Sequence, residues 1–273
     1  HVVISNKVKT TEDGRWRSLD GTAMIEANVP ISEHYNAVLA DRLTRLFGIE
    51  WEQRDRGAER NAAWELAPVP ETLIREFSSR SSQIDREKDR LIAEYVELTG
   101  RSPSSARIIQ LRAKATLATR PEKEIHSLFD LTTEWRGRAQ KILGRGAFEW
   151  AKEVTARPIA RPTLRADDIP LDAITEVAAS VIGAVEEKRS TWRHWNLWAE
   201  TSRQTMGWRF ATIEDREAIT AMIVEAAEGR SIALTPSELA LSPTEFRRDD
   251  GTSVFPPRHS VVYSSLETLA AED

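Results

Sequence analysis

Apolar residues recur at helical spacing along most of this chain, and short alternating stretches lie in its first quarter. Between residues 35 and 47 they return every three or four positions, which predicts a helix that starts at an N-cap Ser32 and stops at Gly48. A longer stripe of the same period, between Pro70 and Gly100, predicts one long helix.

Two pairs of strands are predicted beside these helices. Residues 2–8 alternate imperfectly and residues 15–19 follow after a turn at Gly14, so we expect a β-hairpin. A second pair, residues 49–54 and 63–66, flanks a polar turn. The mixture of strands and helices predicts an α+β fold.

Beyond about residue 104 the pattern predicts helices and no further strands. The expected helices cover residues 104–118, 127–143, 147–155, 172–187, 195–205 and 214–228. Pro158 and Pro162 restrict any helix between residues 155 and 172, so residues 156–162 are the clearest predicted linker.

The composition narrows the class of protein. The chain has 273 residues, 40% of them hydrophobic, which is enough for about two modest domains with cores. It has no cysteine, so disulfides and thiolate metal sites are excluded and a metal would need nitrogen or oxygen ligands. No apolar stretch approaches the roughly 20 residues that cross a bilayer, and we expect a cytoplasmic protein without membrane insertion.

The charge distribution is uneven. A net charge of −5 argues against DNA binding by the whole surface, because Lys and Arg supply most of the non-specific affinity for phosphates. The stretch from Arg101 to Ile125 differs, with six basic residues against two acidic ones. Local contact with DNA and a solvated helix face are both compatible with this count.

The chain opens on His1 at the head of a predicted strand, without a preceding methionine, so we expect it to be a piece of a longer protein. With the aromatic and basic run Gly14–Gly21, this opening resembles the MobF (TrwC-type) conjugative relaxases, in which a His-x-His pair begins such a strand. Later stretches resemble further blocks of that family, in the same order: Ser32–Ala40, Trp64–Pro70, Leu73–Arg80, Ala118–Lys123, Lys188–Trp192, Gly251–Phe255 and Thr268–Asp273.

The resemblance implies a domain organisation. It implies the C-terminal part of an antiparallel-sheet, palm-like relaxase domain with long helices, followed by a mainly α-helical connector module. The expected parts are a relaxase part (1–125), a helical linker (126–165), a small helical module (166–235) and the start of a helicase-proximal region (236–273). A relaxase sheet without its N-terminal half would be incomplete, so we predict marginal stability for residues 1 to about 100.

The resemblance also implies a reaction for the intact protein. Such a relaxase nicks one strand at a plasmid transfer origin and holds it covalently by tyrosine transesterification, with a histidine-bound divalent metal (Mg, Mn or Zn). His1 falls where the last metal-binding histidine would be, so it is the expected ligand of a site that is incomplete here. The family's nucleophilic tyrosines and helicase phosphate loop match no residues of this chain, which is therefore expected to bind DNA without nicking it.

Six residues are candidate contacts to single-stranded or transfer-origin DNA. Cations can meet phosphates, and an indole can stack on a base of any sequence. The alternative for the tryptophan is a core position, with its neighbouring arginines solvated on the opposite face of the strand. The candidates are Lys7, Arg15, Trp16, Arg17, Arg120 and Lys123.

The competing hypothesis is a non-enzymatic helical interaction module, whose partners would be coupling and accessory proteins of the conjugation machinery. Trp192, Trp195 and Trp198 fall at helical spacing, and this pattern favours a packed face of the helical module over a platform for DNA bases.

The tyrosines and the remaining histidines give weaker signals. All three tyrosines lie in apolar patterns and are expected to be structural rather than nucleophilic; they are Tyr35, Tyr95 and Tyr263. A metal hydrolase centred on this chain would need other histidines to converge with His1, and no short spacing supports it. Those histidines are His34, His126, His194 and His259.

Overall fold

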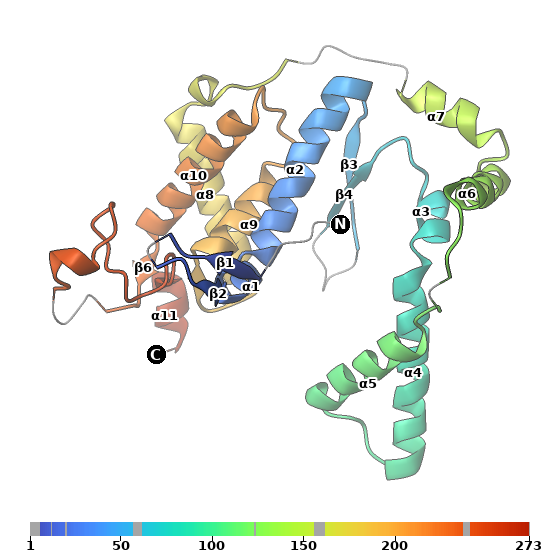
Figure 1. Cartoon of the computed structure of the whole chain (residues 1–273), viewed down its shortest axis with the longest axis horizontal. Helices are drawn as coiled ribbons and strands as arrows, with labels where there is room; N and C mark the ends of the chain where they lie inside the picture. The colour runs from blue at the N-terminus through green and yellow to red at the C-terminus, as the bar shows by residue number, and fades with distance from the viewer. Residues whose placement is uncertain are drawn as a thin grey trace. The chain divides into compact units, whose positions relative to one another are not determined.

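The computed structural model divides into two compact units (Figure 1). Unit 1 joins residues 1–46 to residues 159–273, and unit 2 is the continuous stretch 47–158. The residues that the structure describes are 6–11, 13–19, 21–56, 62–122, 124–155, 162–236 and 241–272.

Unit 1 is mainly helical. Its helices are α1 (Gly21–Glu26), α2 (Asn28–Phe47, which enters unit 2 at its last residue), α8 (Leu171–Glu186), α9 (His194–Gln204), α10 (Ile213–Arg230) and α11 (Leu266–Glu272), with the 3-10 turns η1 (Ala166–Asp168) and η2 (Thr244–Phe246). Its strands are β1 (Lys7–Lys9), β2 (Trp16–Ser18), β5 (Trp192–Arg193), β6 (Ile232–Ala233) and β7 (Val262–Ser264).

Helices α8, α9 and α10 enclose the core of unit 1. The buried residues of α8 recur on one helical face, which packs against the other two helices. Burial of a large apolar side chain stabilises a fold by about 1.5–3 kcal/mol, so this cluster accounts for much of the stability of unit 1. Its buried members are Ile174, Ala178, Val181, Val185, Trp192, Leu197, Phe210, Ile219, Ile223, Val224 and Ala227.

Helix α2 packs in the same unit through a partly polar face. Its buried residues include Asp41 and Thr44 beside small side chains. The Asp41 carboxylate accepts two hydrogen bonds from the Arg216 guanidinium of α10, at 2.7 and 3.0 Å, and both side chains are buried. Arg216 also donates to the carbonyl oxygen of Trp208 at 2.8 Å, so a satisfied buried ion pair joins α2 to α10.

The start of α2 differs from the sequence prediction. The helix begins at Asn28, and the expected N-cap Ser32 lies inside it. Pro30 occupies the first turn, where its missing N–H breaks no hydrogen bond of the helix. The short helix α1 was not predicted.

Residues 192, 232 and 263 meet in a three-stranded antiparallel sheet of order β5-β7-β6. The sequence did not predict it, because β5 and β6 have two residues each, too few to show alternation. Trp192, expected on a helix, lies on β5. Its side chain is nevertheless packed into the core, as predicted.

Unit 2 contains an antiparallel hairpin and five helices among its described residues. The elements are β3 (Trp51–Arg54), β4 (Ala63–Leu66), α3 (Glu71–Phe77), α4 (Ser79–Thr99), α5 (Ser105–Ala118), α6 (Leu128–Leu143) and α7 (Ala147–Thr155).

The single long helix expected between Pro70 and Gly100 is interrupted. Ser78 has φ −103° and ψ 38°, outside the helical region, and separates α3 from α4. The predicted stop is confirmed, since Gly100 ends α4 with a left-handed φ of 68°.

Helices α4 and α5 share a small core, whereas α6 and α7 do not contribute buried residues. The core consists of Leu91, Leu111 and Ala115. Within the described part of α6 and α7, every residue keeps some exposure.

The α+β fold class is confirmed, with helices predominating. The helices predicted beyond residue 104 correspond to α5 through α10 within two residues at each end. Across the described ranges, we find no helix with the length and apolar character needed to span a membrane. The domain boundaries expected at residues 125, 165 and 235 stay predictions.

Candidate nucleic-acid interface

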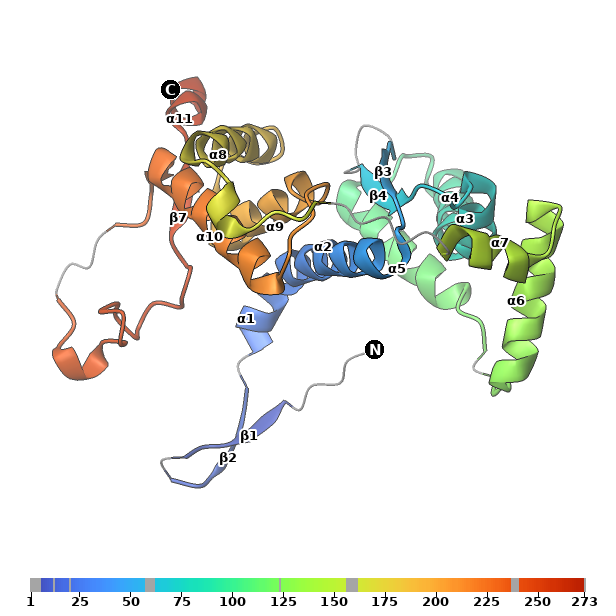
Figure 2. The same ribbon diagram turned by 90° about the horizontal axis from the view of Figure 1, so that it is seen from above.

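The exposed β1–β2 hairpin carries four of the six predicted DNA contacts. Lys7, Trp16 and Arg17 lie on its strands, and Arg15 directly precedes β2. Its register pairs Lys7 with Ser18, Val8 with Arg17 and Lys9 with Trp16, and every residue of both strands is exposed. Figure 2 shows the two strands side by side, leading into α1.

The tryptophan of this hairpin is not a core residue. Its side chain is 69% exposed, which removes the alternative of a buried Trp16 with solvated neighbours. Paired residues lie on the same face of a hairpin, so Lys9 stands beside Trp16 while Arg17 lies on the other face. Lys9 was missed from the sequence, and the pairing register around the Gly14 turn was the signal that could have found it.

Asp13 organises the turn between the strands. Its carboxylate accepts hydrogen bonds from the Thr10 hydroxyl, from the backbone N–H of Arg15 at 3.1 Å and from the Arg17 guanidinium at 2.6 Å. These bonds, with that from Thr10 first, hold the pKa of Asp13 below its usual value. The aspartate therefore stays ionised and orients Arg17, while it also offsets part of the cation's charge.

The second predicted basic stretch lies on α5 and beyond it. Arg112 forms an ion pair with Asp85 at 2.5 Å, and Arg107 donates to Gln110 at 2.9 Å, so these cations are engaged within unit 2. Arg120 follows α5 and is exposed. Lys123 lies outside the described residues.

The predicted metal ligand His1 also lies outside the described residues. Within the ranges that the structure covers, no three side chains of His, Asp or Glu are grouped so that they could hold a metal ion. His194 and His259 come together, with ring centroids 3.9 Å apart and an interplanar angle of 22°. Stacked imidazoles direct their in-plane lone pairs sideways rather than at a common centre, which makes this pair unsuitable as a chelate.

The tryptophans near α9 are packed rather than offered to solvent. Trp192 is 1% exposed and its Nε1 donates to the Ser231 hydroxyl at 3.2 Å. Trp198 and Trp208 pack against the core cluster. Trp195 contacts the His194 ring edge-on, at 4.9 Å between centroids. The predicted packed face is therefore confirmed for this group.

The three tyrosines occupy different environments. Tyr263 on β7 packs against the core of unit 1, and Tyr95 packs against the small core of unit 2. Burial raises the pKa of Tyr263, with a smaller contribution from Glu228. Tyr35 is 62% exposed on α2, so the core position expected for it is wrong.

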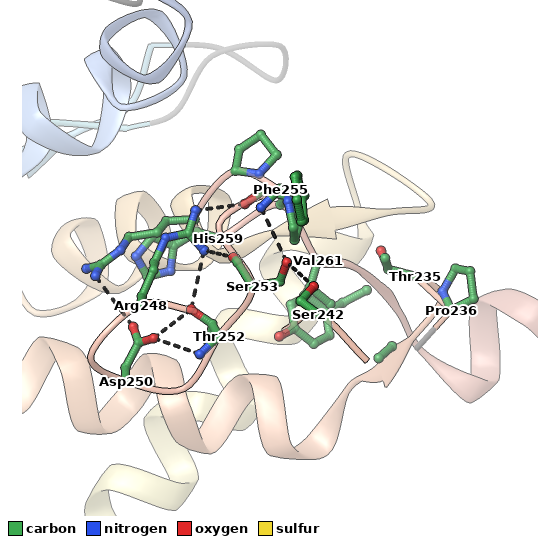
Figure 3. A pocket seen from close by; sticks show the side chains of 16 residues that line it. Thr235, Pro236, Ser242, Arg248, Asp250, Thr252, Ser253, Phe255, His259 and Val261 are labelled. Carbon is green, nitrogen blue, oxygen red and sulfur yellow. Dashed lines mark hydrogen bonds and ion pairs between the residues drawn. The ribbon is translucent and has the colours of Figure 1, made fainter. Parts of the chain in front are cut away.

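A pocket of about 870 Å³ lies in the C-terminal part of unit 1 (Figure 3). Its walls come from β6, β7 and residues 242–261, and they include Phe255, Val261 and Tyr263 beside Thr235 and Ser253. The sequence pattern does not indicate this pocket, because most of its wall residues lie in loops without periodicity.

Comparison with known proteins gives one match. A family model described as TrwC relaxase matches residues 1–142 of this chain. Neither the curated proteins nor the solved structures gave a match. The matched stretch contains the β1–β2 hairpin, α1 and α2 of unit 1, and most of unit 2.

Proposed function

This chain belongs to the TrwC relaxase family, that of the MobF-type conjugative relaxases, and we propose that its β1–β2 hairpin is a contact surface for single-stranded DNA. The role of the chain is relaxase-related. The observation that carries the proposal is Trp16, an indole 69% exposed on a ribbon that also bears Lys7, Lys9, Arg15 and Arg17.

The two faces of the hairpin offer the contacts that a DNA strand needs, for its bases and for its phosphates. A base can stack on the exposed indole of Trp16, with Lys9 beside it for a phosphate. Arg17 is held in place by Asp13, which lowers the entropy lost when its guanidinium meets a second phosphate. Such contacts recognise a strand without reading its sequence.

For the whole relaxase we propose strand transfer to a tyrosine. The tyrosine oxygen attacks the scissile phosphorus, the 5′ phosphate stays on the tyrosine, and the 3′ oxygen leaves with a proton. We assign this tyrosine to no residue of the chain. No three described His, Asp or Glu side chains are grouped so that they could hold the divalent ion of the family, and the ligand role of His1 rests on the resemblance alone.

A salt titration of the full chain tests the DNA contact. Fluorescence anisotropy with a labelled single-stranded oligonucleotide gives the dissociation constant at each salt concentration. Four phosphate contacts predict a slope of about −2.8 in log–log form, or about 50-fold weaker binding between about 50 and about 200 mM salt. In the Arg15→Ala/Arg17→Ala variant we expect a slope of about −1.4 and only about sevenfold weakening over the same range.

Two further variants separate stacking from charge. Trp16→Ala removes the indole and is expected to weaken binding about 5- to 150-fold at every salt concentration, with the slope unchanged. Asp13→Asn removes the charge that offsets Arg17 and is expected to tighten binding.

The matched control removes two cations elsewhere. Lys88→Ala/Arg90→Ala changes the net charge by the same amount on a helix, α4, that has no tryptophan for a base to stack on. We expect this variant to bind as the parent chain does. No binding at low salt, or equal slopes for the hairpin and control variants, would refute the proposal.

A second candidate function is contact with a protein partner through α6 and α7, as in the interaction-module hypothesis. Its supporting observation is that Phe129, Trp135 and Phe148 are 77%, 42% and 64% exposed. Binding of a conjugation coupling protein through this surface should tolerate salt and be lost in Phe129→Ser/Phe148→Ser. If Arg15→Ala/Arg17→Ala abolishes that binding instead, the assignment to α6 and α7 fails.

A further inference from the structure

The C-terminal loop of unit 1, residues 241–261, is shaped by an arginine. Arg248 donates to the carbonyl oxygens of Ser253 and Pro256 and to the Thr252 hydroxyl (Figure 3). It also donates to the carbonyl oxygen of Val254 at 3.3 Å, and all of these partners lie within the loop. Arg248 therefore gives the loop its form without tying it to the helices.

His259 joins this loop to the helical core. Its ring stacks on His194 of α9, with 3.9 Å between centroids, and meets Trp195 edge-on at 5.0 Å. The Nδ1 atom of His194 lies 2.9 Å from Oε1 of Glu228 on α10, a hydrogen bond that fixes the ring beneath His259. The loop thus ends on an imidazole stack that α9 and α10 support together.

The backbone of His259 depends on this contact. Its φ of 58° lies in the left-handed region, which is unfavourable for a residue with a Cβ, and no other described non-glycine residue has a positive φ. Such conformations persist only where surrounding contacts maintain them. If the stack is lost, the strained conformation loses its support.

Charged and titratable groups face His259 from each neighbouring element. His194 comes from α9, Glu228 from α10 and Arg258 from the loop itself, and Tyr263 of β7 lines the same cavity. Burial, followed by His194 and Arg258, holds the pKa of His259 below its usual value, and Glu228 acts in the opposite direction. The closed position therefore favours the neutral ring.

We propose that His259 is a pH-sensitive latch, which holds the C-terminal loop closed on α9 while its ring is neutral and releases the loop when the ring is protonated. Protonation brings a full charge against His194 and against the partly buried surroundings of the ring. Because the loop forms much of the wall of the 870 Å³ pocket, release also opens that pocket.

The direction of the effect follows from linkage. The open loop binds the proton more readily than the closed loop, so closure is fully favoured above about pH 6.5, the ordinary value for histidine, and is lost as the pH falls below it. A single proton can change the ratio of open to closed loop by at most about tenfold between pH 7.5 and 5.5.

Spin labels can measure this ratio, because the chain has no cysteine of its own. The variant Met222→Cys/Val254→Cys places labels on exposed positions of α10 and of the loop. Pulsed electron resonance should give one narrow distance at the higher pH and a second, longer population at the lower one. A reference pair on the helices, Leu171→Cys/Met222→Cys, should keep one distance at both.

Two histidine variants complete the design. His259→Phe keeps an aromatic ring on His194 but cannot take up a proton, so we expect the loop to stay closed at both pH values. His126→Phe makes the same substitution at an exposed histidine of unit 2 and should leave the pH response intact.

Three results would overturn the latch. The first is an open population of the parent chain that does not rise at low pH, and the second is opening of the His259→Phe variant at either pH. The third is a change of the reference distance together with the loop distance, which would mean acid unfolding of the whole unit. A pH response confined to the loop and abolished by His259→Phe supports it.

Discussion

The buried ion pair between α2 and α10 offers a quantitative test of what holds unit 1 together. In Asp41→Ala, Arg216 keeps its hydrogen bond to the Trp208 carbonyl but loses both bonds to the carboxylate, and its charge stays 1% exposed without a counter-ion. Removing one partner of a buried pair costs about 3–5 kcal/mol. Arg209, 3.7 Å from the same carboxylate, loses a neighbour as well, which favours the upper part of that range.

The assay is hydrogen exchange of the α10 backbone amides, which report the opening of unit 1 as a whole. A loss of about 3–5 kcal/mol corresponds to protection lowered about 100- to 4,000-fold. The matched control is Glu26→Ala, which removes an Arg–carboxylate bond of 3.0 Å in the same unit, between side chains that are 36% and 46% exposed. An exposed pair contributes less than about 1 kcal/mol, so protection should fall less than about fivefold.

A double variant tests the physical cause. Asp41→Leu/Arg216→Met replaces both members of the pair with apolar groups of similar volume and removes the buried, unpaired guanidinium of the single variant, so it should recover most of the lost protection. If Asp41→Ala lowers protection no more than Glu26→Ala does, the pair is not a buried anchor of α2 and the reasoning is wrong.

Substitutions at four further positions have expected outcomes. Trp192→Ala should cost about 3–5 kcal/mol in urea unfolding, because the ring is 1% exposed, whereas Trp192→Phe should cost clearly less. Gly144→Ala, at the C-cap of α6, should lose about 1 kcal/mol because its φ is 66°, while Gly137→Ala in the open interior of α6 should gain up to about 1 kcal/mol, both measured by thermal unfolding. The pKa of Asp215 is lowered, chiefly by the backbone N–H of Ala166, so its stabilisation is present above about pH 4 and is lost as the pH falls further. Asp215→Asn should therefore be less stable than the parent chain at neutral pH, and the difference should shrink as the pH falls below about 4.

The elements with several turns or a clear stop were predictable. The helices beyond residue 104 contain enough periods for their pattern to stand out, and Gly100 marks the end of α4 as expected. The break at Ser78 was not predictable, because the apolar stripe continues through it and serine has no strong preference against a helix.

The candidate interface was predictable only in part. The aromatic and basic character of residues 15–17 is written in the local sequence, but the exposure of Trp16 depends on whether another element covers the hairpin. The position of Lys9 beside Trp16 depends on the strand register, which is fixed by the length and type of the turn, and a shift of one residue would place Lys9 beside another side chain. The stack of His194 and His259 joins residues 65 positions apart, through a loop without periodicity, so no local pattern announces it.

The discontinuity of unit 1 has a consequence for cleavage of the chain. Residues 1–46 and 159–273 meet in one compact unit, with the intervening residues forming the other. A protease that cuts within residues 47–158 would therefore leave two polypeptides still joined by the contacts of α2 with α9 and α10, such as the ion pair of Glu33 with Arg203 at 2.9 Å. Such a nicked molecule should elute as one species in native buffer and separate only in denaturant, and its two pieces, mixed after separation, should complement each other to rebuild the unit.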